Sequence, residues 1–177
     1  SDDALVVTAI EFNETKVLGF EVQLTAIESS YQAGLRLAEQ LPKQDLRHVF
    51  VLSDGLHVNG SQLVAGLVEN LPPHVTLTGG LAGDGDRFSA TFVLWNDVPK
   101  IDTVAVVGLY GRHLRVRYGS LGGWDSFGPE RLITKSKGNI LYELDGRNAL
   151  DLYKKYLGEH ANELPASGLL YPLSLRT

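Results

Sequence analysis

The chain has 177 residues, of which 44% are hydrophobic and 21% are charged, and its formal net charge is −5 at pH 7. This composition is typical of a globular domain, and the absence of Cys excludes disulfides and zinc–thiolate sites. The negative charge argues against nucleic-acid binding, and no apolar run approaches the ~18 residues that span a bilayer.

The first third of the chain predicts two strands and a helix. Residues 5–12 and 18–24 alternate apolar and polar side chains on either side of a polar turn, which is typical of a hairpin. Ser29 and Gln32 form a capping-box pattern, and Pro42 marks the end of the helix that follows. The apolar stripe of this helix consists of Tyr31, Leu35 and Ala38.

The middle of the chain predicts a strand, a helix and a second strand. Residues 48–52 form a short β-branched run, and residues 75–80 form another that ends in glycines. Asn59 and Gln62 repeat the cap pattern before the helix between them. Its apolar stripe consists of Leu63, Val64, Leu67, Val68 and Leu71. This order favours a parallel β-α-β unit.

The last part of the chain predicts an antiparallel stretch and a final helix. Strand-like runs separated by turns lie at 89–96, 103–111, 114–121, 131–136 and 139–144. Asp145 is the predicted cap of a helix that ends at Gly158, and residues 165–177 have the composition of a linker. The helix stripe consists of Ala149, Leu152, Tyr153, Tyr156 and Leu157. We therefore expect a mixed α and β fold, either α+β or α/β, with helices packed on a largely antiparallel or mixed sheet containing a β-α-β unit.

The loop from Ser53 to Gly60 is the first candidate ligand site. It lies between a predicted buried strand and a capped helix, where ligands of α/β sheets bind. The candidate ligand-binding residues of this loop are Ser53, Asp54, Gly55, His57 and Asn59. Taken singly, they have a structural interpretation as a turn, a helix cap and a surface histidine.

A glycine-rich loop at 78–88 is the second candidate. Gly79 and Gly80 allow a ligand to approach the backbone closely, while Asp84 and Arg87 offer charged contacts. The loop matches neither a phosphate-binding loop nor an EF-hand. The alternative is a long turn braced by an Arg–Asp pair.

A third loop, at 118–134, carries Trp124, which can close over a pocket or anchor the loop in the core. The preceding run places His113, Arg115 and Arg117 on one face of the expected strand. This basic face is either an ordinary solvated surface or an anion site.

Catalysis and metal binding have little support in the residue pattern. The chain offers no cysteine nucleophile or serine elbow, and its five histidines form no short chelating pair. The residues alone therefore do not indicate an enzyme or a metal site. A hydrolase or transferase using Asp84, Asp86 and His57 remains an alternative that requires these side chains to converge.

Three segments, at 49–67, 78–96 and 123–158, resemble in order and spacing the N-terminal part of the FIST domain family of bacterial sensory proteins. The resemblance implies a cytoplasmic sensory domain at 1–164 that lacks the first elements of the family, followed by a linker at 165–177 toward an absent C-terminal half. It also implies a small amino-acid-like ligand and a signalling partner such as a histidine kinase or a cyclic-di-GMP enzyme.

One branch of this family is similar to haem proteins that sense nitric oxide, which makes haem the cofactor to consider. Because the chain has no Cys or Met, an axial ligand within it is His or Tyr. His57 is the first candidate because it lies in the first loop, and His113 is the second.

Overall fold

The computed structural model describes residues 4–24, 29–96 and 98–176. It divides into two compact units, one formed by Ser1–Ala82 and Phe92–Tyr118 and the other by Gly83–Thr91 and Gly119–Thr177. None of the helices in the described part of the chain has the length and apolar character that a bilayer crossing requires.

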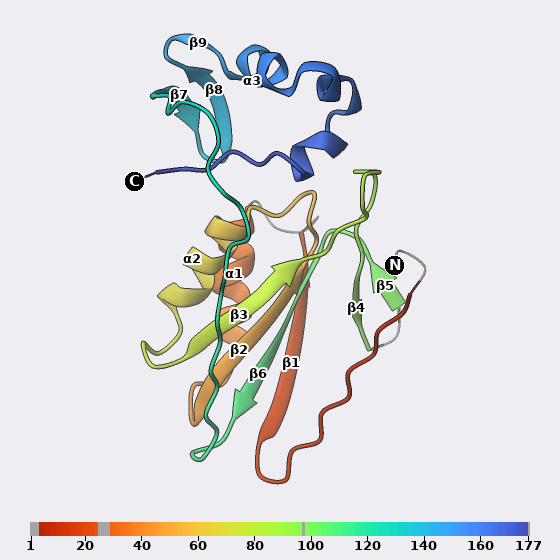
Figure 1. Ribbon diagram of the computed structural model, residues 1–177. Helices are drawn as coiled ribbons and strands as arrows, with labels where there is room; N and C mark the ends of the chain where they lie inside the picture. Colours follow the sequence, from red (N-terminus) through yellow and green to blue (C-terminus); the bar gives the residue numbers. More distant parts are fainter. Residues whose placement is uncertain (1–3, 25–28, 97, 177) are drawn as a thin grey trace. The chain divides into compact units, whose positions relative to one another are not determined.

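The first unit is built on a four-stranded mixed sheet (Figure 1). Its strands in spatial order are β1 (Lys16–Gln23), β6 (Thr103–Tyr110), β2 (Leu46–Ser53) and β3 (Thr76–Leu81). β2 and β3 run parallel, while β6 is antiparallel to both β1 and β2. The mixed fold is confirmed, and the parallel strands with the helix between them form the expected β-α-β unit.

Two helices, α1 (Ser30–Gln40) and α2 (Gly60–Glu69), cover one face of this sheet (Figure 1). Both expected caps form, since Ser29 Oγ and Asn59 Oδ1 accept the N–H groups of the residues three positions on. The core between sheet and helices includes Leu37, Val49, Leu67, Val104 and Val106. The caps therefore fix where each helix begins, and apolar burial fixes its position on the sheet.

The buried stripes differ in detail from the sequence prediction. Tyr31 and Leu35 are only half-buried, and the buried face of α1 consists of Ser30, Ala33, Gly34, Leu37 and Ala38. Val64 and Val68 of α2 are exposed, although the other members of that stripe are buried. The small residues face inward because α1 and α2 approach each other closely at Gly34 and Gly66.

The first strand of the expected N-terminal hairpin does not form. Residues 5–12 have no regular structure, and Leu5 is 90% exposed. β1 pairs over its whole length with β6 instead. Alternation in the sequence indicates an apolar face, but a strand also requires a partner edge, which local sequence does not specify.

The antiparallel region is only partly as expected. Residues 114–121 form no strand, although Leu114 and Val116 are half-buried and the neighbouring Arg115 and Arg117 are exposed. The run at 89–96 contains only the short β4 (Val93–Trp95), which pairs with β5 (Val98–Lys100). Trp95 of β4 lies against Gly19 of β1, so this small hairpin packs on the sheet face that the helices leave open.

The second unit contains a three-stranded antiparallel sheet and one α-helix. Its elements are β7 (Ile133–Lys137), β8 (Ile140–Leu144), β9 (Arg147–Asn148), α3 (Ala149–Leu157), η2 (Gly158–Glu163) and η3 (Ala166–Leu169). The expected stop of α3 at Gly158 is confirmed, and this glycine has a φ of 58°. The boundary between residues 164 and 165 stays a prediction.

The predicted cap of α3 at Asp145 is wrong. Asn148 caps the helix, because its side chain accepts the N–H of Asp151. Asp145 instead accepts the Leu132 N–H at 2.9 Å and an Arg131 N–H at 3.0 Å. These two contacts, the Leu132 hydrogen bond first, lower the pKa of Asp145.

Candidate functional site

Three segments of the first unit meet at one end of its sheet. Ser53, the last residue of β2, lies opposite Leu81 at the end of β3 and opposite Val104 near the start of β6. The parallel pairing of β2 with β3 and the antiparallel pairing of β2 with β6 produce this convergence. Side chains that follow β2 and precede β6 are therefore neighbours.

Asp54, the residue after β2, is completely buried and organises this end of the sheet. One carboxylate oxygen, Oδ1, accepts the backbone N–H groups of Leu56 at 2.8 Å and His57 at 2.7 Å. The other, Oδ2, accepts the N–H of Asp102 at 3.3 Å, and the Asp54 N–H donates to the Thr103 carbonyl at 2.9 Å. The carboxylate thus holds the loop after β2 to the residues at the start of β6.

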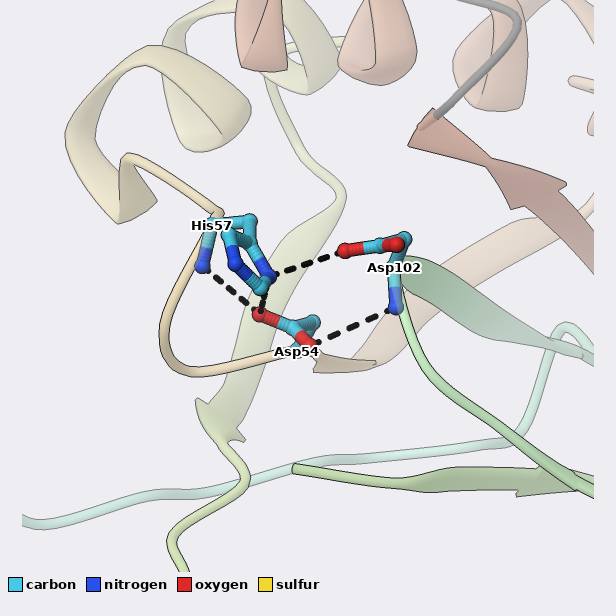
Figure 2. A group of neighbouring side chains, drawn as sticks. All are labelled: Asp54, His57 and Asp102. Carbon is cyan, nitrogen blue, oxygen red and sulfur yellow. Dashed lines mark hydrogen bonds and ion pairs between the residues drawn. The ribbon is translucent and has the colours of Figure 1, made fainter. Parts of the chain in front are cut away.

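His57 lies between two carboxylates (Figure 2). Its Nδ1 atom is 2.8 Å from Asp102 Oδ1 and 3.3 Å from Asp54 Oδ1. The His57 side chain is 60% exposed, and that of Asp102 is 21% exposed. The site therefore combines a buried acid, a half-buried acid and an imidazole that is accessible from solvent.

Asp102 is the member of this cluster that the sequence analysis missed. It precedes a strand-like run and belongs to no motif, and its backbone has a φ of 50°. The only sequence signal was an aspartate at the start of a strand. The antiparallel pairing of β6 with β2, which local sequence does not reveal, brings it to His57.

At two glycines of the candidate loops, the backbone of a neighbouring segment approaches so closely that a side chain would not fit. A Cβ on Gly55 would lie 1.9 Å from the Ala82 carbonyl oxygen, and one on Gly79 would lie 1.9 Å from the Val51 carbonyl oxygen. A Cβ on Gly80 would meet no atom within 4 Å, so this position is open. The loops after β2 and β3 are therefore in contact, and the Ala82 N–H donates to the Ser53 carbonyl at 2.8 Å.

Asn59 has the structural role given as the alternative in the sequence analysis. Its side chain caps α2, and its N–H donates to Ser30 Oγ at 2.9 Å. Because these contacts hold both helices at the same end of the sheet, Asn59 positions the loop. Its contact with a ligand stays a prediction.

Asp84, Arg87 and Trp124 belong to the second unit, so their part in a site shared with the loop after β2 stays a prediction. Asp84 Oδ2 accepts the N–H groups of Ser89 at 2.7 Å and Ala90 at 3.1 Å. The Ser89 hydrogen bond is the main reason that the pKa of Asp84 is lowered. Trp124 is 66% exposed.

The second haem-ligand candidate, His113, is exposed in a segment without regular structure. The first, His57, has its Nδ1 atom engaged by carboxylates and much of its ring in solvent. Haem requires extended apolar walls, and these polar surroundings do not fit it.

Comparison with known proteins identifies the family. The model of the FIST N domain matches residues 1–147. Searches of curated proteins and of solved structures found no significant match. The matched region includes the loop after β2, Asp102 and the whole four-stranded sheet. The chain therefore belongs to the FIST N family, a family of sensory domains of signal-transduction proteins.

Proposed function

We propose that this chain binds a small amino-acid-like metabolite at the loop after β2 and relays its binding to a signalling partner. The observation that carries the proposal is the group formed by Asp54, His57 and Asp102 at the end of the sheet. Ligands of α/β sheets bind at this position, beyond the carboxyl ends of parallel strands.

The chemistry of the group suits a ligand with an ammonium and a carboxylate. Asp102 and Asp54 attract the ammonium, because charge-assisted hydrogen bonds to carboxylates are the stronger ones. The amino end of α2, which begins at Gly60, favours the carboxylate through its positive dipole. The exposed side of His57 leaves the site accessible from solvent.

Signalling would follow from a shift between two arrangements of the loop. Asp54 is hydrogen-bonded both to the loop and to Asp102, so a ligand that replaces the His57 contact to Asp102 perturbs both connections. A ligand shifts such an equilibrium only through different affinities for the two arrangements. The family resemblance makes a cytoplasmic histidine kinase or cyclic-di-GMP enzyme the proposed reader.

A thermal-shift screen of the 177-residue chain against amino acids, in buffer containing EDTA, tests this proposal. Ligands that bind the folded state raise Tm by mass action. We expect at least one amino acid to raise Tm, and Asp102→Asn and His57→Gln to reduce the shift. His74→Gln and Asp125→Asn, which change exposed residues elsewhere, should leave it unchanged. A screen without any shift, or equal shifts in all variants, contradicts the proposal.

Haem sensing of nitric oxide is the alternative carried by the family resemblance. Its test is the visible spectrum of the chain after addition of haem, where a Soret band of bound haem that is lost in His57→Ala or His113→Ala would support it. We expect no such band, because the surroundings of both histidines are polar or open.

A further inference from the structure

We propose that Asp54, His57 and Asp102 form a binding site for a divalent transition-metal cation such as Zn²⁺. His57 Nδ1 and one oxygen of each carboxylate would be the ligands, and these atoms all lie within 4.8 Å of one another. The proposal goes beyond metabolite sensing and does not depend on it, because the metal is bound by the chain's own side chains alone.

The distances from the imidazole nitrogen to the two carboxylate oxygens match those between neighbouring ligands of one metal ion. Zinc lies about 2.1 Å from nitrogen and oxygen ligands, so two ligands are about 3.0 Å apart at a right angle and about 3.4 Å apart in a tetrahedron. Nδ1 of His57 is 2.8 Å from Asp102 Oδ1 and 3.3 Å from Asp54 Oδ1. A metal ion that binds Nδ1 could therefore reach an oxygen of each carboxylate at distances typical of metal ligands.

The charge of the group favours a divalent cation. Two carboxylates lie within the reach of one imidazole, and Asp54 is completely buried. Neighbouring carboxylates repel each other. A divalent cation balances two negative charges, whereas a positively charged imidazole balances only one. The amino end of α2 carries about half a positive charge, which opposes the cation but is smaller than the two charges of the carboxylates.

The ligands are held in place by contacts outside the group. The Asp102 carbonyl accepts the N–H of Leu24 at 2.7 Å, and the Asp102 N–H donates to Asp54 Oδ2 at 3.3 Å. Asp54 already accepts two backbone N–H groups on Oδ1, so it is the weakest ligand of the three. We therefore assign His57 and Asp102 as the main ligands.

The ligand set and exposure favour zinc-like metals over magnesium and calcium. Imidazole nitrogen suits Zn²⁺, Ni²⁺ and Cu²⁺, whereas Mg²⁺ and Ca²⁺ prefer oxygen ligands only. His57 is 60% exposed, which gives the ion a route from solvent and leaves a coordination position open.

Isothermal titration of EDTA-treated, dialysed protein with Zn²⁺, with no metabolite present, tests the site. We expect one saturable site in the micromolar range or tighter, and a rise in Tm with Zn²⁺. His57→Gln and Asp102→Asn should each weaken binding about tenfold or more, because loss of even an outer-shell partner of a metal ligand typically costs that much. Excess Mg²⁺ should not compete.

Controls separate this site from adventitious surface binding. His74→Gln and Asp125→Asn should bind Zn²⁺ like the unchanged chain, and circular dichroism should show that all variants are folded. Absence of binding, undiminished binding in His57→Gln and Asp102→Asn, or loss of binding in His74→Gln would each overturn the proposal. EDTA keeps divalent metal out of the metabolite screen, and the zinc titration contains no metabolite. Failure of one proposal is therefore distinguishable from failure of the other.

Discussion

Asp102 contacts the imidazole of His57 at 2.8 Å, although one residue precedes β6 and the other follows β2. The contact exists because β6 runs antiparallel to β2, so the start of one strand lies beside the end of the other. Asp54 stabilises this contact, because its carboxylate accepts hydrogen bonds from the backbone N–H groups of both residues. The candidate site is thus a product of sheet topology.

Replacement of Asp54 by alanine should destabilise the first unit strongly. The change removes the buried carboxylate that accepts several part-buried backbone N–H groups, including those of Leu56 and His57. We expect a loss of about 3 kcal/mol in the free energy of unfolding, measured by urea denaturation. Asp86→Ala, at an exposed position, should change it by no more than about 0.5 kcal/mol. Equal effects of the two substitutions would show that the Asp54 contacts are unimportant.

Alanine at Gly66 should destabilise the chain although alanine favours helices. A Cβ at Gly66 would lie 2.1 Å from the Tyr31 carbonyl oxygen, which belongs to the backbone of α1 and cannot move alone. The expected cost is about 1–3 kcal/mol, larger than the helix-propensity gain of about 1 kcal/mol. Gly60→Ala is the control, because its Cβ would meet only side-chain carbons at 3.9 Å. Thermal unfolding should lower Tm for Gly66→Ala and leave Tm unchanged or raised for Gly60→Ala.

Acidification should weaken the first unit through His48. This side chain is 4% exposed, and its Nδ1 and Nε2 atoms lie 2.7 Å and 3.0 Å from the hydroxyls of Thr76 and Thr78. Burial lowers the pKa of His48 below its ordinary value of 6.5. As the pH falls, the unfolded chain therefore takes up a proton on His48 before the folded chain does. The contribution of neutral His48 to the free energy of unfolding is fully present above pH 6.5, and it is lost as the pH drops toward the pKa of the folded state.

The measurement is the free energy of unfolding at about pH 7.5 and about pH 5.5 for the native chain and for His48→Gln. Glutamine keeps hydrogen-bonding groups but does not titrate. We expect a smaller loss of stability on acidification in the variant. An identical loss in both proteins would assign the pH dependence to other groups.

A larger side chain at Gly19 should displace the small hairpin of β4 and β5. The Trp95 ring occupies the space above Gly19, where a Cβ would lie 1.7 Å from a ring carbon. Gly19→Val should therefore expose Trp95 and shift its fluorescence emission to longer wavelength. Trp124→Phe as the background isolates Trp95, because the chain has two tryptophans. Unchanged emission would show that the ring does not depend on this contact.

Local signals predicted well the elements whose ends are set by their own residues. The caps at Ser29 and Asn59 are short-range hydrogen bonds, so the starts of α1 and α2 could be read from the sequence. The cap of α3 was misplaced because Asp145 and Asn148 are both good cap residues. A contact with Leu132 on a distant segment engages the first of them.

Pairing between strands, and not periodicity along the sequence, determined which of the predicted runs became strands of the sheet. Residues 5–12 have the alternation of a strand but no partner edge, whereas β2 and β6, with equally short signals, pair in the centre of the sheet. For the site, the sequence placed Asp54 and His57 in a loop after a buried strand. No sequence pattern indicated that Asp102 contacts these two residues.

The sequence by itself determined the starts of α1 and α2, the β-α-β unit and the loop that carries Asp54 and His57, because these depend on neighbouring residues and on apolar periodicity. Only the tertiary structure decided which strands pair and that Asp102 completes the cluster. That decision rests on the burial of a shared core and on hydrogen bonds between segments distant in the chain, which no local pattern records.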